Sequence, residues 1–331
     1  MTDAAGKQTQ AGQASLGIAH LVKQYANADR PVLNDISFDV PHGKVFVIVG
    51  PSGSGKSTLL RTIAGLEPIQ GGTISLNGEV IETGKPGTES AGRSKRSSEL
   101  RTRVGMVFQS YDLFPNKTVL GNITLAPTLV QKRDKAAVEQ EAIRLLERVG
   151  LADRKDSWPH ELSGGLRQRV MIAMAMVCKP KLLIADEPTT ALDVTIEAQI
   201  LRLMKELRDE TGMSVLIITH NMGVVAEICD YVYVMYAGKI MEQAETFELF
   251  DHTMHPYTKG LLDSIPRIGQ NAERLHTIPG VVPNLLHLSQ GCPFNNRCEY
   301  ATDQCRTEKA QLHPVAPDHQ VRCFRCEEEH Q

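Results

Sequence analysis

Short apolar runs recur along the first 250 residues, and each ends in glycine or polar residues. They lie at residues 44–49 (KVFVIV), 181–185 (KLLIA), 214–219 (SVLIIT) and 231–236 (YVYVMY). Runs of this length that are rich in β-branched residues are typical of buried strands. The residues between the second and third runs place Ile196, Ile200, Leu203 and Leu207 on one helical face. Strands that alternate with helices predict an α/β protein with a largely parallel sheet.

The same pattern divides the chain into regions. Residues 138–149 carry apolar side chains at helical spacing, and Gly150 is a typical helix stop. We therefore expect a helical insert inside the α/β domain, whereas the Ser-, Gly-, Lys- and Arg-rich residues 83–99 indicate a solvated loop. The sequence beyond about residue 250 is rich in Pro, His and Cys, which indicates a separate small domain. The predicted regions are a disordered start at 1–15, an α/β domain at 16–250 with its insert at about 110–165, and a C-terminal domain at 251–331.

Composition narrows the class of protein. The 331 residues suffice for two unequal domains, and a hydrophobic content of 41% suffices for a buried core. A net charge of −3 gives no basic surplus for binding nucleic acid. No run of about 18 apolar residues is long enough to span a bilayer, and the polar opening lacks the apolar segment of a secretory signal. We expect a protein that folds in the cytoplasm and reaches a membrane only through a partner.

A phosphate-binding motif follows the first apolar run. Residues 50–57 read GPSGSGKS and match G-x-x-x-x-G-K-[ST] between a predicted strand and a predicted helix at 56–64. Its glycines let backbone N–H groups approach phosphates, and the helix N-terminus favours anions. Lys56 is expected to reach the β- and γ-phosphates, and the Ser57 hydroxyl to bind Mg²⁺. The predicted ATP-binding residues here are Gly50, Ser52, Gly53, Ser54, Gly55, Lys56, Ser57 and Thr58.

Two carboxylates follow another predicted strand, in the segment LLIADE. Asp186 at the strand end is expected to help hold Mg²⁺. Glu187 is expected to act as general base on the attacking water. Acids at strand ends are often helix caps or solvated groups, but a phosphate loop in the same chain favours the catalytic interpretation.

A third motif identifies a family. Residues 162–169 read LSGGLRQR, which resembles the signature motif of ATP-binding cassette (ABC) proteins. The usual form is LSGGQ, and Leu166 is a tolerable departure because in the family the Ser and the glycines make the phosphate contacts. Four other residues match family elements in the family's order. They are Tyr25 for adenine stacking, Gln109 in MVFQS as the Q-loop, Asp193 in ALD as the D-loop and His220 in IITH as the switch histidine.

The resemblance implies a fold and a mechanism. The fold would be a RecA-like P-loop core with the ABC helical subdomain, and the activity ATP hydrolysis coupled to transport. Two cassettes would clamp two ATP molecules, with Ser163, Gly164 and Gly165 binding the γ-phosphate across the interface. His220 would orient the γ-phosphate and water beside Glu187. Gln109 would join this catalytic group and, with Ser57 and Asp186, bind Mg²⁺.

The last third of the chain resembles a narrower group. HPYTKGLLDSIP at residues 255–266 and GCPFNNRCEYATDQC at 291–305 are similar to the C-terminal extension of oligopeptide/dipeptide transporter ATPases, a group that includes nickel and glutathione importers. RQRVMIAMAM and DEPTTALDVTIEAQIL agree with it. The resemblance implies an ATPase at the cytoplasmic face of the cell membrane that powers peptide uptake. Its partners would be two permease subunits, a second identical or related ATPase and, indirectly, an external solute-binding protein.

Five of the seven cysteines fall between Cys292 and Cys326. In a reducing cytosol, such a cluster suggests metal more than disulfides. The family resemblance implies that Cys292, Cys298, Cys305 and Cys323 are the ligands of an iron–sulfur cluster, of which [4Fe–4S] is the expected type. Because Cys326 is a fifth cysteine, the identity of the fourth ligand stays open. One alternative is a zinc site to which Cys323 and Cys326 contribute. Another is that all these thiols are reduced and free. Outside this cluster, we expect Cys178 and Cys229 in the core and His313 and His319 at the surface.

The front half points to other solutes. The segment GMVFQSYDLFPNKTVLGNITLAP is more similar to ATPases of polar amino-acid importers, and the change to the peptide pattern falls roughly between Gly150 and Leu162. Polar amino acids, nickel or another small solute are therefore alternatives to peptides. A soluble ABC protein of translation or DNA repair is less favoured, because the chain has one cassette and no long coiled-coil insert. A non-transport iron–sulfur protein is disfavoured by the intact ATP motifs.

Overall fold

A parallel sheet forms the centre of the computed structural model, which describes residues 14–26, 28–87, 102–189, 192–219, 221–265, 277–283 and 288–328. Its parallel strands are β3 (Val45–Val49), β6 (Val104–Val107), β7 (Leu182–Asp186), β8 (Ser214–Ile218) and β9 (Tyr231–Tyr236). They lie in the order β9-β3-β8-β7-β6, and every residue of β3 and β8 is buried. The α/β prediction is confirmed, because such continuous apolar runs require cover on both faces of a sheet.

Helices pack against this sheet. They are α1 (Lys56–Ile63), α6 (Val194–Thr211), α7 (Met222–Ile228) and α8 (Thr246–Asp251). The apolar face predicted for α6 is confirmed, since Ile200, Leu203 and Leu207 are buried and Ile196 packs partly against the core. Gly212 ends α6 in the left-handed conformation, at a φ of 68°.

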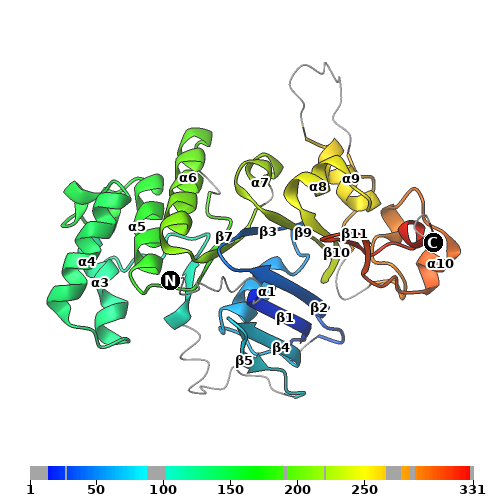
Figure 1. Cartoon of the computed structure of the whole chain (residues 1–331), viewed down its shortest axis with the longest axis horizontal. Helices are drawn as coiled ribbons and strands as arrows, with labels where there is room; N and C mark the ends of the chain where they lie inside the picture. Colours follow the sequence, from blue (N-terminus) through cyan, green and yellow to red (C-terminus); the bar gives the residue numbers. More distant parts are fainter. Residues whose placement is uncertain are drawn as a thin grey trace, which may run out of the picture.

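A second sheet was not apparent from the hydrophobic pattern. Its antiparallel strands are β1 (Ala14–Lys23), β2 (Leu33–Pro41), β4 (Gly71–Leu76) and β5 (Glu79–Thr83), in the order β2-β1-β4-β5. It covers α1, so that Leu59, Leu60 and Ile63 of the helix share one core cluster with Leu16 and Ile74 of the sheet. The phosphate-loop helix is therefore enclosed between two sheets, as Figure 1 shows.

The helical insert projects from the side of the parallel sheet opposite the C-terminal segment (Figure 1). It contains α3 (Val119–Leu129), α4 (Lys135–Arg148), the short 3₁₀ helices η1 (Ala152–Arg154) and η2 (Pro159–Glu161), and α5 (Gly164–Met176). Buried Asn122 fixes the loop before α3, because its amide donates to the carbonyls of Phe114, Lys117 and Thr118. Within the described ranges, no helix combines the length and hydrophobicity needed to cross a bilayer.

The C-terminal segment joins the central sheet instead of forming a sheet of its own. The central sheet continues from β9 into β10 (Lys239–Glu245). The C-terminal segment then comprises α9 (Pro256–Asp263), η4 (Asn295–Arg297), α10 (Asp303–Thr307), β11 (His313–Ala316), β12 (His319–Val321) and α11 (Phe324–Glu328). Strand β12 pairs antiparallel with β10, with Glu242 opposite Val321, and β11 pairs with β12. The two last strands thus extend the sheet to eight strands. The sequence-based boundaries at residues 250 and 251 remain a prediction.

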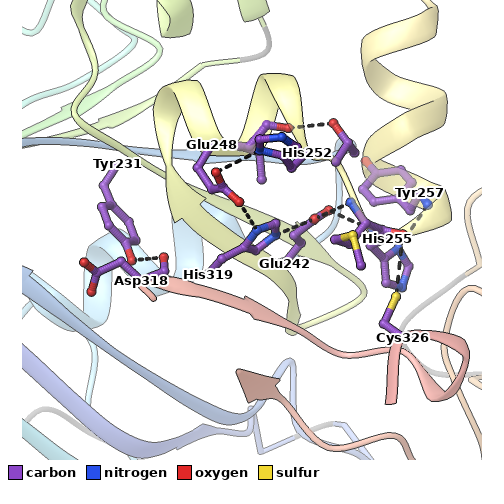
Figure 2. A network of polar contacts seen from close by, with 12 residues as sticks. Tyr231, Glu242, Glu248, His252, His255, Tyr257, Asp318, His319 and Cys326 are labelled. Carbon is purple, nitrogen blue, oxygen red and sulfur yellow. Dashed lines mark hydrogen bonds and ion pairs between the residues drawn. The ribbon is translucent and has the colours of Figure 1, made fainter. Parts of the chain in front are cut away.

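A buried polar network holds β12 in place (Figure 2). His319 is 1% exposed and contacts Glu242 Oε1 through Nε2 at 2.9 Å and Glu248 Oε1 through Nδ1 at 3.3 Å. Glu242 also accepts the backbone N–H groups of Met254 at 2.8 Å and His255 at 3.1 Å. The expectation of a surface position for His319 is therefore wrong, because the pairing of β12 with β10 encloses this side chain between β10 and α8.

Candidate functional site

The phosphate loop lies between β3 and α1 and lines a cavity of about 800 Å³. The side chain of Lys56 is 8% exposed, and its Nζ donates to the carbonyl oxygens of Gly50 and Pro51 at 2.9 Å each. Burial lowers the pKa of Lys56, and the charges of Glu187 and Asp186 oppose this effect. The loop thus curls around its own cation at the edge of the cavity. Seven of the eight predicted loop residues line the cavity, and Ser54 is buried outside its lining.

The loop backbone requires glycine at one position in particular. Gly50 has a φ of 156°, and a Cβ atom there would lie 2.1 Å from the Met235 carbonyl oxygen. No real side chain tolerates that distance, so the backbone of β9 packs directly beneath the loop. Gly53 also has a positive φ, of 77°, but a Cβ atom added there would have no atom within 4 Å. Only strain in the backbone conformation excludes other residues there.

Acidic and amide side chains meet at the carboxyl ends of the parallel strands. Asp186 ends β7 and is hydrogen-bonded to Ser57 in the first turn of α1. Burial raises the pKa of Asp186, and the Ser57 hydrogen bond opposes it. Gln109, two residues beyond β6, donates to Glu187 Oε2 at 3.4 Å. The structure therefore brings these four predicted residues together at the edge of the sheet where α/β proteins bind ligands.

The backbone of Glu187 is in an unusual conformation. Its φ is 44°, in the left-handed region that side chains other than glycine rarely adopt, and its N–H donates to the Ile218 carbonyl at 3.0 Å. Such strain is found where surrounding structure fixes a side chain in one direction. His220, predicted to act beside Glu187, lies outside the described residues.

Tyr25 lines the same cavity from the loop that connects β1 and β2. Its hydroxyl lies 3.5 Å from Thr58 Oγ1, and Lys23 Nζ lies 4.7 Å from the centre of its ring. The side chain is 39% exposed, so part of the ring is free to stack on a planar ligand.

The signature motif lies away from this cavity. Ser163 is exposed and occupies the N-cap position of α5 without a side-chain capping hydrogen bond, and Gly164 and Gly165 are the first residues of that helix. A Cβ atom on Gly165 would lie 2.7 Å from Ile196 Cγ2, so α5 begins in close contact with α6. Neither these three residues nor Asp193, the N-cap of α6, is among the residues that line the cavity. Within one chain, the signature motif therefore does not meet the phosphate loop.

The C-terminal segment contributes cavity residues that the sequence did not reveal. Beside the phosphate loop, the lining includes Tyr257 and Leu261 of α9, Ile278 and Val282 of residues 277–283, and Arg297 of η4. The i, i+4 spacing of Tyr257 and Leu261 shows that they share a helical face. Nothing in the sequence shows what that face contacts, because the contact depends on the docking of the whole segment.

Four cysteines line a second cavity, of about 290 Å³. They are Cys292, Cys298, Cys305 and Cys323, as the sequence predicted, whereas buried Cys326 contacts the Met254 carbonyl instead, at 3.7 Å. Burial raises the pKa of Cys292 to about 12, and a hydrogen bond from Cys326 lowers that of Cys323 to about 7. Among the residues that the structure describes, no three His, Cys, Asp or Glu side chains are placed to hold one metal ion.

The two cysteines expected in the core differ in exposure. Cys229 is buried at the end of α7, and Cys178 is half-buried just beyond α5. Burial raises the pKa of both thiols, which keeps them protonated at neutral pH.

Two family models match the chain. The model of ABC transporters matches residues 33–190, and the model of the oligopeptide/dipeptide transporter C-terminal region matches residues 241–305. Among solved structures, cbiO1 of Clostridium perfringens, part of the ABC transporter complex cbiONQ, has a TM-score of 0.65 and 30% identity over 72% of this chain and 92% of its own. The ATP-binding cassette MJ0796, solved as a dimer bound to ADP and Pi, has a TM-score of 0.61 and 26% identity over 70% and 98%. The predicted ABC fold is confirmed.

Curated relatives align with nearly the whole chain. The oligopeptide transport ATP-binding protein OppD of Haemophilus influenzae is 43% identical over 300 residues, which cover 88% of this chain and 91% of the relative. The dipeptide transport ATP-binding protein DppD of Escherichia coli is 41% identical over 317 residues, which cover 94% and 96%. On this identity and coverage, the chain belongs to the ABC transporter ATPases, in the family of oligopeptide/dipeptide transporter ATP-binding subunits.

Proposed function

We propose that this ATPase powers the uptake of di- or oligopeptides across the cell membrane, as a peripheral subunit at the cytoplasmic face. The observation that carries the proposal is the joining of two features in one fold. A phosphate loop and strand-end carboxylates share one cavity, and the peptide-type C-terminal segment lines that cavity too. Relatives named for oligopeptide and dipeptide transport align over both halves of the chain. This favours peptides over polar amino acids, nickel or another small solute.

The cavity residues have distinct proposed roles. The phosphates of ATP bind the N–H groups of the loop and the charge of Lys56, and the base stacks on Tyr25. The hydrogen-bonded pair of Ser57 and Asp186 presents oxygens of the kind that Mg²⁺ prefers, and Gln109 completes this set. When bound, Mg²⁺ neutralises charge on the phosphates.

Glu187 is the proposed general base. Gln109 donates to its carboxylate, and the fixed backbone directs it toward the cavity lining. A carboxylate held in this way can accept a proton from the attacking water. His220 is proposed to orient the γ-phosphate and the water beside it. His220 follows β8, whose carboxyl end lies beside that of β7 in the sheet.

A second cassette is needed to complete the site. Because Ser163, Gly164 and Gly165 lie outside the cavity of their own chain, we infer that they bind the γ-phosphate of a partner cassette, with Asp193 at the same interface. The N–H groups at the start of α5 suit an anion. The partner is a second copy or a related ATPase. The helical insert is proposed to contact two permease subunits, which receive the solute from an external binding protein.

Partner identification tests this proposal. The tagged chain would be extracted from native membranes in mild detergent, and co-purifying proteins identified by mass spectrometry. A peptide-class permease pair is the expected result. A polar amino-acid permease would contradict the peptide substrate, and recovery without any membrane protein would contradict a transport role.

We also propose that the four-cysteine cavity holds an iron–sulfur cluster, which the family resemblance implies for these four thiols. Four thiols from separate segments line one cavity, and thiolates are the ligands that such a cluster requires. The test is iron and acid-labile sulfide content after anaerobic purification. Cys305→Ser should lose both, whereas Cys178→Ser, on a half-buried thiol elsewhere, should keep both. Zinc in place of iron would support the alternative site.

A further inference from the structure

The nucleotide cavity has an apolar wall that no ATP motif supplies. We define this wall as Leu261, Ile278 and Val282, which line the cavity together with Tyr25 and the phosphate loop. We propose that the wall contacts the base and ribose of the bound nucleotide, so that the C-terminal segment is part of the ATP-binding site. This inference rests on the proposed placement of ATP in the cavity.

The wall is packed firmly enough to serve as a binding surface. Ile278 lies so close to α9 that a Cβ atom added to Gly260 would be 2.8 Å from its Cγ1. All three wall residues also pack against the main hydrophobic core while remaining partly accessible from the cavity. The neighbouring Val281, by contrast, is 89% exposed and does not line the cavity. The segment therefore presents Ile278 and Val282 to the cavity and Val281 to solvent.

Arg297 positions the wall. Its guanidinium donates to the carbonyl oxygens of Ile278 at 3.0 Å and Pro279 at 2.8 Å, and to the Tyr236 hydroxyl at 3.3 Å. Tyr236 ends β9, the strand that also packs beneath the phosphate loop through Met235. Arg297 thus ties residues 278 and 279 to the same strand that supports the loop. Because three of its five N–H donors bind protein oxygens, Arg297 acts as a positioning residue for the wall.

The chemistry of the wall selects which part of the nucleotide it contacts. The loop already offers N–H groups and Lys56 to the phosphates, whereas the wall offers only aliphatic surface. Burying charged phosphate oxygens against aliphatic groups is unfavourable, while burying a base and the carbon face of a ribose is favourable. Tyr25 offers a base its aromatic face, and the wall supplies further apolar contact in the same cavity.

The test compares two neighbouring valines with two ligands. Val282→Asn makes the wall polar without adding charge, and Val281→Asn makes the same change on the exposed side of the segment. Affinities of the full-length protein for ADP and for pyrophosphate are measured by titration calorimetry with Mg²⁺. We expect Val282→Asn to weaken ADP binding three- to tenfold and to leave pyrophosphate binding within twofold of wild type. Val281→Asn should leave both unchanged.

If circular dichroism shows that Val282→Asn does not fold, the milder Val282→Ala and Arg297→Gln are measured in its place. Both should weaken ADP selectively, and this selectivity distinguishes a positioning role from general destabilisation. Unchanged ADP affinity in folded Val282→Asn and Val282→Ala would overturn the inference. Equal losses for ADP and pyrophosphate would overturn it too, because the wall would then act on the phosphate loop. Wild-type protein that binds neither ligand would instead refute the proposed placement of ATP in the cavity.

Discussion

Replacement of His319 by alanine should destabilise the protein far more than replacement of His20, although each histidine is paired with a carboxylate. His319 Nε2 lies 2.9 Å from Glu242 Oε1, with side chains 1% and 0% exposed. His20 Nδ1 lies 2.8 Å from Asp35 Oδ1, with side chains 81% and 49% exposed. The two pairs have nearly equal lengths, so burial is the main difference between them.

The expected magnitudes follow from that difference. Removal of one partner from a buried ion pair costs about 3–5 kcal/mol, because the other charge stays buried without compensation. Glu242 retains two backbone N–H donors, from Met254 and His255, which favours the lower end, about 3 kcal/mol. An exposed pair contributes about 0–1 kcal/mol. Urea unfolding of His319→Ala and His20→Ala, followed by far-UV circular dichroism, would measure both values.

The effect should also depend on pH in a definite direction. Burial alone would lower the pKa of His319, but the hydrogen bonds and charges of Glu242 and Glu248 outweigh it and raise the pKa. A raised pKa in the folded state stabilises the protein fully below the ordinary value of 6.5 and loses that effect as pH rises through the folded-state pKa. His255 does not share this charge, because burial lowers its pKa to about 4.

Two results would refute this reasoning. One is an equal destabilisation by His319→Ala and His20→Ala. The other is a difference between wild type and His319→Ala that grows as the pH rises above 6.5. A double variant with Glu242→Gln provides a further control. If an uncompensated charge is the cause, the double variant should lose less stability than the two single variants added together.

Three further predictions concern the ATP site. Glu187→Gln should reduce ATP turnover by about 10²–10⁴-fold and accumulate ATP-bound dimers in size-exclusion chromatography; normal turnover would exclude Glu187 as the base. Gly50→Ala should abolish nucleotide binding, because the added Cβ would lie 2.1 Å from a backbone carbonyl oxygen. Gly53→Ala should cost only about 1–3 kcal/mol of stability in urea unfolding. Equal effects of the two variants on nucleotide binding would contradict the geometry. Gly165→Ala should displace α5 from Ile196 and lower turnover without weakening ADP binding by the monomer. Weakened ADP binding would contradict the proposal that the signature motif serves the nucleotide site of the partner cassette.

The buried parallel strands could be predicted because each one is a continuous apolar run. Strand β9 has the predicted bounds, β3 and β8 are each one residue shorter than predicted at one end, and β7 is shifted by one residue. The antiparallel sheet has half-buried strands and therefore contains no continuous apolar run. Strand β2 does alternate, with Ile36, Phe38 and Val40 buried, and this is the signal that could have identified it. Strand β1, by contrast, changes register against β2 at three points, which breaks the alternation that marks such strands.

The site was predictable to the extent that motifs determine it. The phosphate loop, Asp186 and Glu187 depend on local sequence and on the common direction of parallel strands. The wall, by contrast, depends on how residues 277–283 dock on α9, and no local pattern encodes that contact. The choice between Cys323 and Cys326 is similar. The two cysteines lie three residues apart and are hydrogen-bonded to each other, yet Cys323 lines the cavity whereas Cys326 does not and contacts the Met254 carbonyl.

The extension of the central sheet by β12 and β11 changes which strand is exposed at its edge. With both strands present, the edge strand is β11, whose Pro314 has no N–H group to offer a neighbouring chain. Without them, β10 would become the edge, and five of its seven residues are buried in the intact fold. A chain shortened before residue 313 would therefore leave the backbone N–H and C=O groups on one side of β10 unpaired, and such an edge is suited to pairing with other copies. We therefore expect a chain without these two strands to aggregate more readily than the intact protein.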